Sequence, residues 1–330
     1  MDDSQSASVG VVIVNWNGWP YTVAACRSLG QSLHRNFKIV IVDNASVDDS
    51  LLQLRAAVPN ADIISNQRNE GFSGGCNIGI RHALGLGCDY IFLLNNDAMV
   101  DDLTIEQLVS VSRDLHDRVL LGSVIHDAAS GDHVFFGNRA GSVLGSQINF
   151  TISDDVQKLD QKLIETDFIV GAALFLPAKL LSRIGLFDER FFLNFEETDL
   201  CYRARKLDIP SFVVSSSRIR HHGGASVGPY HAPMQAYFLT RNRLLFADKH
   251  GSFARRFQLY ILNLKWIYWS LRKSWAAART VDLPTRAMAR ACWDYMLRRF
   301  GDCPAVIRQY DARYREQSHA PSSTGGAAVP

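Results

Sequence analysis

Short apolar runs alternate with amphipathic segments through the first 125 residues, and this alternation restricts the chain to one class of fold. The runs Val9–Val14 and Phe37–Val42 are apolar at nearly every position, which is typical of parallel strands buried on both faces. The pattern predicts strands at 9–14, 37–42, 61–65, 90–94 and 119–125, and helices at 21–33, 47–58, 76–86 and 103–116. This order indicates an α/β fold with a mostly parallel sheet and helices on both faces.

The later part of the chain is less regular. We predict strands at 167–176 and 212–214 and helices at 178–184 and 198–207, with an irregular segment at 126–165. The composition changes after residue 250. The tail at 316–330 is rich in Ser, Gly, Ala and Pro, which predicts disorder.

Charge and cysteine content exclude several classes of protein. The net charge of the 330 residues is only +2, so we expect no nucleic-acid partner. The six cysteines form no C-x-x-C pair, which favours free thiols in a reducing cytoplasm. The acidic first eight residues do not resemble a signal peptide, and no apolar run reaches the roughly 18 residues of a membrane span.

Polar segments follow three of the predicted strands. They are NWNG at 15–18, DNAS at 43–46 and NNDA at 95–98, and ligands of open α/β sheets bind beyond the carboxyl ends of the strands. Asp97 suits a hard divalent cation, or it caps a loop. Asp43 suits a pyrimidine N–H or a ribose hydroxyl, or it begins an Asx turn with Ser46 as the N-cap of the next helix. Asn15 and Asn17 have the same two interpretations.

Three further segments carry candidate chemistry. NEGFSGGCNIG at 69–79 either brings its backbone close to a phosphate or sugar or forms a tight turn. FDERFFLNFEETDLCYR at 187–203 holds five acids among aromatic residues, and such crowding raises a carboxyl pKa toward the range of a general base. The alternative is a set of helix caps. RHHGGAS at 220–226 holds a histidine pair suited to a metal, although a lone histidine is usually structural.

Together and in this order, these segments resemble the family 2 glycosyltransferases, and within them the rhamnosyltransferase-like branch. The resemblance runs from about Val9 to Asp248 and rests on VVIVNWNG, VDNASVDDS, NEGFSGGCNIG, LLNNDA, GAALFLP, FDERFFLNFEETDLCYR, HHGGAS and TRNRLLF. It implies the GT-A fold at 1–250, with a Rossmann-like nucleotide-binding half at 1–125 and an acceptor half at 126–250. A basic helical region at 251–315 and the tail at 316–330 would follow.

The resemblance also implies roles for individual residues. Glu197 takes the position of the catalytic base, with Glu196 and Asp199 as further catalytic residues, although which glutamate is the base stays open. Asp97 and His221 would bind Mg²⁺ or Mn²⁺. The nucleotide-sugar site would comprise Asn15, Asn17, Asp43, Asn44, Asn69, Gly71, Asn77, Asn96 and Asp97. Asn95 and Glu197 stand where many relatives have aspartate. Arg241 and Asn242 match a recurring pair to which the residues assign no role.

The implied activity is inverting transfer of a sugar, with rhamnose as one candidate, from a dTDP- or UDP-sugar to the hydroxyl of a glycan or lipid-linked glycan, in cell-surface polysaccharide synthesis. One alternative is a sugar-nucleotide pyrophosphorylase, but NWNGWP after the first strand is not a basic phosphate loop. The other is a non-catalytic binding module, which would have lost Asp97 or the acidic segment.

The region 251–300 is strongly basic. It has ten Lys and Arg and two Asp, and ten minus two gives +8, with four tryptophans among them. Gln258, Lys265 and Arg272 recur every seven residues as a polar stripe on an otherwise apolar helix. Such helices suit the surface of an anionic membrane, here at its cytoplasmic face. The alternatives are packing on the catalytic domain or a homodimer interface.

Overall fold

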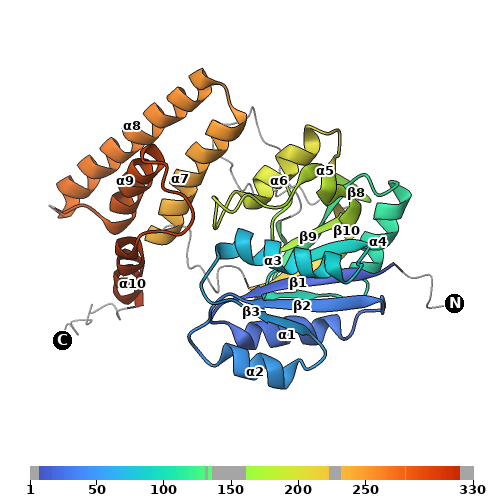
Figure 1. The fold of residues 1–330 in the computed structure, drawn as a ribbon. Helices are drawn as coiled ribbons and strands as arrows, with labels where there is room; N and C mark the ends of the chain where they lie inside the picture. The colour runs from blue at the N-terminus through green and yellow to red at the C-terminus, as the bar shows by residue number, and fades with distance from the viewer. Residues whose placement is uncertain (1–6, 131–132, 136–160, 223–231, 279, 320–330) are drawn as a thin grey trace, which may run out of the picture. The chain divides into compact units, whose positions relative to one another are not determined.

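The computed structural model describes residues 7–130, 133–135, 161–222, 232–278 and 280–319. The chain forms two compact units, residues 1–226 and 227–330. Figure 1 shows the helices and strands of the first unit and the helices of the second, most of them labelled.

The first unit contains the parallel sheet that the apolar runs predict. Four strands, β1 (Val9–Asn15), β2 (Phe37–Asp43), β3 (Asp62–Ser65) and β4 (Tyr90–Leu94), pair in parallel in the order β3-β2-β1-β4. Val9, Val11 and Ile13 of β1 are buried on one face of the sheet, and Val12 is buried on the other. Burial on both faces explains why these strands show no polar alternation.

The sheet continues beyond β4 with mixed strand directions. Its next strands are β9 (Ala173–Pro177), β6 (Leu120–Asp127), β10 (Ser211–His221) and β5 (Ala98–Val100), with β7 (His133–Phe135) beside β6 and β8 (Leu163–Thr166) beside β10. Only the β6–β10 pairing is parallel in this part. The α/β class is therefore confirmed, but the sheet is mixed and not mostly parallel as predicted, because the strands after β4 pair largely in antiparallel.

Two strand predictions were wrong in extent. The strand expected at 167–176 begins only at Ala173, and β10 runs to His221 instead of ending at 214. Residues 215–217 are all serine, which hides a strand from a hydrophobic pattern. They are tolerated because the register shifts there and the buried Ser217 Oγ lies 2.7 Å from Ser123 Oγ, where either hydroxyl can donate.

Helices cover both faces of the sheet (Figure 1). One face packs on α1 (Trp19–Leu29), α2 (Ser50–Ala57) and α4 (Thr104–Asp114), and the other on α3 (Gly71–Gly85), α5 (Leu181–Ile184) and α6 (Glu196–Arg205). A short 3-10 helix, η3 (Ala178–Leu180), precedes α5. The prediction of Ser46 as a helix cap was wrong, because α2 begins at Ser50 and Ser46 Oγ donates to Asp43 Oδ1 at 2.6 Å.

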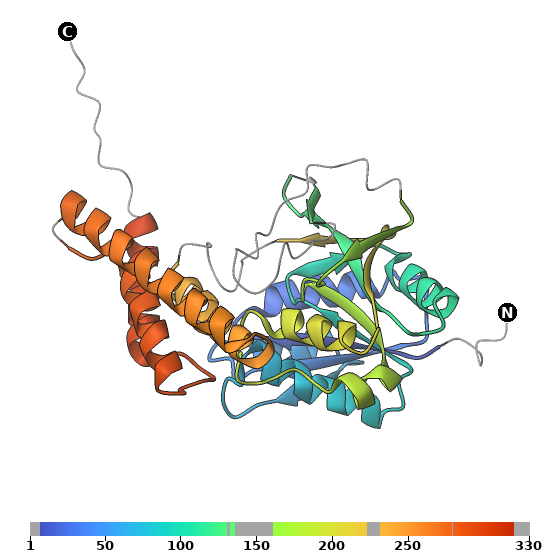
Figure 2. The ribbon, with the colours of Figure 1, turned by 90° about the horizontal axis from the view of Figure 1, so that it is seen from above.

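The second unit is helical. It contains α7 (Pro233–His250), α8 (Phe253–Ala278), α9 (Leu283–Met296) and α10 (Ala305–His319), and Figure 2 shows α8 in orange as one unbroken helix. Leu244 and Ala247 of α7 share a core with α8 and α9. Because of this packing, the units divide after residue 226, earlier than the boundary that the sequence placed after 250. Residues 316–319 are helical, and the rest of the tail lies outside the described residues.

A buried polar cluster explains Arg241 and Asn242. The Arg241 guanidinium is fully buried, with its carbon 5.2 Å from the Tyr237 ring centroid and 5.0 Å from that of Phe238. Its Nε donates to Asn242 Oδ1 at 3.0 Å. Tyr237 Oη donates to Asp294 Oδ2 of α9 at 2.9 Å. Arg241 and Asn242 therefore have a structural role: Arg241 packs on Tyr237, and Tyr237 joins α7 to α9.

We expect Arg241→Met to lower the free energy of unfolding by about 3 kcal/mol, because it leaves buried polar groups without their cation. Urea denaturation followed by tryptophan fluorescence measures this, since four of the six tryptophans lie in the second unit. Arg313→Met is the matched control, because Arg313 is exposed on α10. Equal stability of the two variants would contradict the structural role.

Candidate functional site

Asn15 and Asp43 form a polar network at the ends of β1 and β2. Both are buried. Asn15 Nδ2 donates to Asp43 Oδ1 at 2.9 Å, and Thr22 Oγ1 donates to Asn15 Oδ1 at 2.7 Å. These bonds fix both side chains at the carboxyl edge of the sheet, where ligands of such sheets bind. The contact with a nucleoside stays a prediction.

Asn17 lies beside this network and is exposed. Its φ is 50°, a left-handed value that asparagine adopts more readily than most residues. Its backbone N–H donates to Ser46 Oγ at 2.9 Å, and its Oδ1 accepts from Val47 N at 2.8 Å. The structure thus ties the NWNG and DNAS segments together, as their positions after neighbouring strands predict.

Asn44 connects the end of β2 to the start of α3. Its Nδ2 donates to Asn69 Oδ1 and to the Gly71 carbonyl, both at 2.9 Å. Its Oδ1 accepts from Asn66 Nδ2 and from the Glu70 N–H. Asn44 and Asn69, both predicted to bind the nucleotide sugar, therefore hold the loop that precedes α3.

The glycines of the segment 69–79 serve packing. A Cβ on Gly75 would lie 2.9 Å from Val14 Cγ1, and one on Gly79 would overlap Val12, so both let α3 lie close to β1. The Phe72 N–H at the start of α3 donates to the Phe192 carbonyl at 2.7 Å, and the Ser73 N–H donates to the same oxygen. Because these amides are occupied, the structure supports the turn interpretation over a phosphate cradle.

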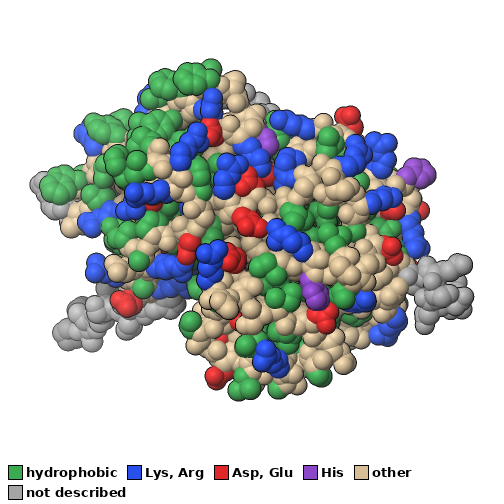
Figure 3. Space-filling model, viewed as in Figure 1, with side chains coloured by type: hydrophobic (Ala, Val, Ile, Leu, Met, Phe, Trp, Pro, Cys, Tyr) green, Lys and Arg blue, Asp and Glu red, His purple; other side chains and the backbone are tan. Residues whose placement is uncertain are grey.

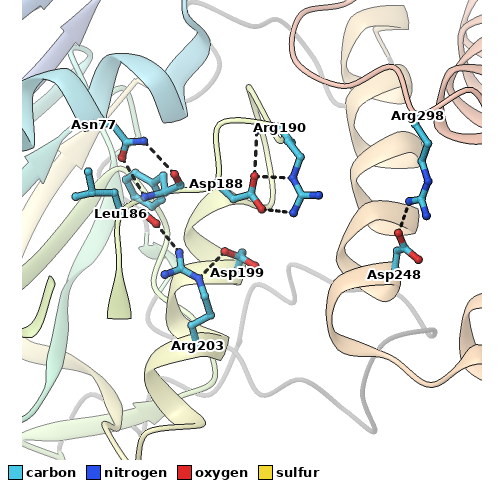
Figure 4. Close-up of polar contacts among 9 residues, drawn as sticks. Asn77, Leu186, Asp188, Arg190, Asp199, Arg203, Asp248 and Arg298 are labelled. Atoms are coloured by element: carbon cyan, nitrogen blue, oxygen red, sulfur yellow. Dashed lines mark hydrogen bonds and ion pairs between the residues drawn. The ribbon is translucent and has the colours of Figure 1, made fainter. Parts of the chain in front are cut away.

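Asn77 holds the acidic segment onto α3. Its Nδ2 donates to the Phe187 carbonyl at 2.9 Å, and its Oδ1 accepts from the Phe187 N–H at 3.0 Å (Figure 4). Asn77 Nδ2 also donates to Glu189 Oε1 at 2.8 Å. The sequence predicted a nucleotide-sugar contact for Asn77. In the structure its polar groups fix the loop that leads to α6.

A strained loop follows this anchor. Phe192, Asn194 and Phe195 have φ values of 64°, 67° and 78°, a region that costs a phenylalanine on the order of 1–3 kcal/mol. Both phenylalanines are buried, so packing offsets this cost. The sequence did not predict this loop, because phenylalanine rarely adopts a positive φ and nothing in FFLNF indicates that Phe192 and Phe195 do so. Backbone strain of this kind is common at functional sites, and the residue that follows the strained loop is Glu196.

Three of the five acids in this segment have a cationic partner. Asp188 Oδ2 accepts from Arg190 Nη2 at 2.6 Å and Asp199 Oδ2 from Arg203 Nε at 2.8 Å (Figure 4). Glu189 Oε1 accepts from Arg81 Nη2 at 3.4 Å. Arg203 also donates to the carbonyls of Ile184 and Leu186. Asp199 is fully buried in this ion pair, which holds its carboxylate against Arg203; its assignment as a catalytic residue stays a prediction.

Glu196 and Glu197 have no cationic partner among the described residues. One oxygen of each carboxyl group, Oε2, is buried without a hydrogen bond. Burial and the charge of Glu197 hold the pKa of Glu196 well above its usual range. Burial also raises the pKa of Glu197, although hydrogen bonds from the backbone oppose this. An uncompensated carboxyl pair with raised pKa values suits proton transfer.

Asp97 and His221 form the second polar pair. His221 is the last residue of β10, which pairs with β5 directly after Asp97, and its Nε2 lies 2.9 Å from Asp97 Oδ1. Burial acts to raise the pKa of Asp97, but the hydrogen bond and charge of His221, together with a backbone hydrogen bond and the charge of His222, outweigh it and the pKa is lowered. The His222 ring instead lies 5.5 Å from that of Tyr21. The structure therefore pairs Asp97 with His221 rather than His222.

Asn95 and Asn96 complete this corner. Asn95 Nδ2 lies 3.3 Å from His221 Nε2. Asn96 is buried and its Nδ2 has no hydrogen-bond partner. It lies against Gly18, where a Cβ would come within 2.8 Å of it. An unpaired buried amide that borders the NWNG segment is a free donor for a ligand.

The segment 170–172 connects the two polar pairs. The Asn95 N–H donates to the Ala172 carbonyl at 3.1 Å. A Cβ on the adjacent Gly171 would lie 3.7 Å from Glu197 Oε1 and 3.2 Å from the Phe72 ring. The acid pair and the Asp97–His221 pair therefore flank the same short segment, although a hundred residues separate Asp97 from Glu197.

The described residues contain no group of three His, Cys, Asp or Glu side chains placed to share one metal ion. Asp97 and His221 supply an oxygen and a nitrogen. Mg²⁺ in particular is often bound through one or two carboxylates, with substrate phosphates and water as its other ligands. Two protein ligands are thus compatible with a cation that binds together with a diphosphate.

We expect Gly71→Ala to destabilise the protein and to lower its activity. Gly71 has φ of +73°, and a Cβ there would overlap the Phe192 carbonyl and ring, so the substitution strains α3 and displaces the loop before Glu196. Thermal unfolding should show a loss of about 2 kcal/mol or more. Gly85→Ala is the matched control. Gly85 lies in the same helix, and a Cβ added there would meet nothing within 4 Å. We therefore expect this substitution to be neutral or stabilising.

Comparison with known proteins identifies the chain. The sequence profile of "Glycosyl transferase family 2" matches residues 10–180, more than half of its length. The dTDP-rhamnosyl transferase RfbF of Shigella flexneri is 23% identical over 252 residues, covering 74% of this chain and 81% of that protein. The N-acetylglucosaminyl-diphospho-decaprenol L-rhamnosyltransferase of Mycobacterium tuberculosis is 22% identical over 263 residues, covering 74% of this chain and 86% of that protein.

Solved structures show the same fold. The mannosyltransferase PcManGT of Pyrobaculum calidifontis, in complex with GDP-Man and Mn²⁺, has a TM-score of 0.56 and 15% identity, covering 94% of this chain and 85% of that one. GalNAc-T7 with UDP, GalNAc and Mn²⁺ has a TM-score of 0.57 and 14% identity, and this chain spans only 58% of it. Both are GT-A glycosyltransferases, so the predicted fold is confirmed. With its sheet, its strand-end polar segments and this profile match, the chain belongs to glycosyl transferase family 2.

Proposed function

We propose that the protein transfers a sugar from a nucleotide-diphosphate donor to an acceptor hydroxyl with inversion at the anomeric carbon. The observation that carries this proposal is the Glu196–Glu197 pair, with Glu196 buried and Glu197 half-buried. The pair has no cationic partner among the described residues and lies against the segment 170–172, which also contacts the exit of β4. A base on one side and, on the other, a corner that can hold a cation against the departing diphosphate are the two parts that a single displacement needs.

In this mechanism Glu197 removes the proton from the acceptor hydroxyl as its oxygen attacks the anomeric carbon. The bond from that carbon to the diphosphate breaks, and the diphosphate leaves with the bonding electrons. Glu196, whose pKa is raised further by the charge of Glu197, keeps its proton and donates a hydrogen bond to the Glu197 carboxylate. Arg190, Arg81 and Arg203 are engaged with the other acids, so they leave the basicity of this pair intact.

Asp97 and His221 would hold Mg²⁺ or Mn²⁺. Their oxygen and nitrogen atoms suit such a cation, which when bound supplies positive charge to the departing diphosphate. The Asn96 amide, which has no partner and lies against Gly18, donates to the donor sugar or its phosphate. Asn17 and Asp43 lie at the ends of the neighbouring strands and border the nucleoside.

Two relatives guide the choice of substrates. The names of the Shigella and Mycobacterium proteins include dTDP-rhamnosyl and L-rhamnosyl transfer, the second with a diphospho-decaprenol acceptor. We propose dTDP-rhamnose as the first donor to test, with UDP-sugars next. The proposed acceptor is a glycan or a lipid-linked glycan of the cell surface.

The experiment has two stages. Thermal-shift measurements with dTDP, UDP and GDP, each with and without Mn²⁺, identify the nucleotide, and the matching sugar donors are then incubated with lipid-linked and soluble acceptors. NMR of the product reports its anomeric configuration. Retention of configuration would rule out the direct displacement. Synthesis of a sugar nucleotide from a sugar phosphate would indicate a pyrophosphorylase, and binding without turnover would indicate a non-catalytic module.

The pH dependence of kcat provides a separate prediction. A general base works only when ionised, and the pKa of Glu197 is raised above 4.5, the ordinary value for glutamate. Activity should therefore rise with pH along an acid limb whose midpoint lies above 4.5. Glu196→Ala removes a hydrogen-bond donor that lowers the Glu197 pKa, so it should move the midpoint to higher pH. Glu196→Gln retains a donor and should move it less.

A further inference from the structure

The helix α8 is apolar over most of its surface, yet only one side of it is buried. Leu259, Asn263 and Ile267 face the core of the second unit. Eight large apolar side chains of α8 are instead exposed: Phe253, Phe257, Leu262, Leu264, Trp266, Tyr268, Trp269 and Trp275. The exposed fractions are high, with Phe253 at 75% and Trp269 at 62%. A contiguous set of this kind on one helix marks an interaction surface rather than scattered exposure.

These side chains form two stripes on either side of a polar line. Phe253, Phe257, Leu264, Tyr268 and Trp275 are spaced by four and seven residues, which places them on one line along the helix. Leu262, Trp266 and Trp269 form the second line. The polar stripe of Gln258, Lys265 and Arg272, predicted from its seven-residue spacing, lies between them and is exposed. The outward face is therefore mostly aromatic with a basic centre.

The charge on this helix has one sign. Between Phe253 and Ala278 the sequence holds five Lys and Arg and no Asp or Glu. Lys265, Arg272 and Lys273 are exposed, and the Arg272 guanidinium lies 5.7 Å from the Trp269 ring centroid. Figure 3 shows hydrophobic side chains gathered along α8 with Lys and Arg among them. A partner that fits this face has negative charges at its surface, which pair with the Lys and Arg side chains, and an apolar layer below that surface, which takes up the aromatic side chains.

From this arrangement we propose that the outward face of α8 binds the surface of an anionic lipid bilayer, with the helix lying in the plane of the interface. Tryptophan and tyrosine rings partition into the boundary between headgroups and acyl chains, and long basic side chains reach back to the phosphates. Among the described residues no helix is both long and apolar enough to cross a bilayer, so the contact proposed is with the surface alone.

A second copy of the chain fits this face less well. Two copies that met through α8 about a twofold axis would bring Lys265, Arg272 and Lys273 of each helix against the same residues of the other. Like charges opposed in a contact are unfavourable, whereas anionic headgroups attract each of them by about 1 kcal/mol. Charge complementarity therefore selects the bilayer.

The test is flotation of the full chain with vesicles. We expect binding to phosphatidylcholine vesicles that contain about 30% phosphatidylglycerol and much weaker binding to phosphatidylcholine alone. Lys265→Gln, Arg272→Gln and Lys273→Gln combined should lower the partition coefficient by about 100-fold, at roughly fivefold per charge. Tryptophan fluorescence should shift to the blue on binding, because Trp266, Trp269 and Trp275 leave water.

The apolar contribution is tested by Trp266→Ser combined with Trp269→Ser, which should reduce binding at least tenfold. The matched control, Leu33→Ser with Leu52→Ser, removes two equally exposed apolar side chains from the first unit and should leave binding unchanged. Equal binding by the two double variants, or binding independent of phosphatidylglycerol, would overturn the proposal. So would self-association that the tryptophan substitutions abolish while vesicles are not bound.

Vesicle binding and sugar transfer are independent readouts. Transfer to a soluble acceptor should not change in the α8 variants, because none of these residues belongs to the proposed active site. If the chain binds vesicles but transfers no sugar, the proposed function is refuted and the proposed binding of α8 to membranes stands. If it transfers sugar but binds no vesicles, only the proposed membrane binding is refuted.

Discussion

Glu197→Gln is expected to lower kcat by about 10³-fold while the affinity for the donor nucleotide changes less than twofold. The substitution keeps the size of the side chain and removes only its ability to take a proton. Because the residues proposed to bind the nucleotide lie at the ends of β1, β2 and β4, we expect nucleotide affinity not to depend on this carboxylate. Steady-state kinetics and nucleotide titration, on the same preparation, measure the two effects separately.

Two variants make the Glu197 result interpretable. Glu165→Gln changes an exposed acid of the same unit and should be silent. Glu196→Gln retains a group that can donate to Glu197, so we expect a loss of about tenfold. If Glu196→Gln loses more activity than Glu197→Gln, the roles of the two residues are exchanged. Full activity in both variants would place the base elsewhere and remove the proposed mechanism.

Asp97→Asn is expected to lower kcat/KM by about 10²–10³-fold, because it removes the charge that would hold a cation at the departing diphosphate. The binding of Mn²⁺ in the presence of a nucleotide diphosphate should weaken in parallel. Electron paramagnetic resonance of free Mn²⁺ measures this without any turnover.

The matched control is Asp102→Asn, an exposed carboxylate just beyond β5, which should leave both quantities unchanged. His221→Ala should weaken Mn²⁺ binding less than Asp97→Asn does, since it removes a neutral ligand instead of a charge. Undiminished Mn²⁺ binding in Asp97→Asn would show that the cation lies elsewhere, whatever happens to the rate.

The sequence alone was sufficient for the class of fold and for the segments that form the site. Strands buried on both faces need β-branched runs such as Val9–Val14, and these appear in the sequence without knowledge of their partners. The polar segments after these strands must meet at one edge of the sheet, since parallel strands end there together. For this reason the positions of Asn15, Asp43 and Asp97 could be predicted from the order of the elements.

Only the tertiary structure decided which polar groups are engaged and which are left without partners. The Asp199–Arg203 ion pair is local, with its residues four apart on α6, but nothing local shows that Glu197 Oε2 has no hydrogen bond. Asn77 Nδ2 donates to the Phe187 carbonyl, which is 110 residues away in the sequence. Gly75 and Gly79 of α3 are needed because Val14 and Val12 of β1 leave no room for a Cβ. The exposed aromatic face of α8 likewise depends on which side the core covers. Hydrophobic patterns arise from each residue's own preference for water or core, whereas a partner, a strained loop or an uncovered face depends on residues distant in the sequence.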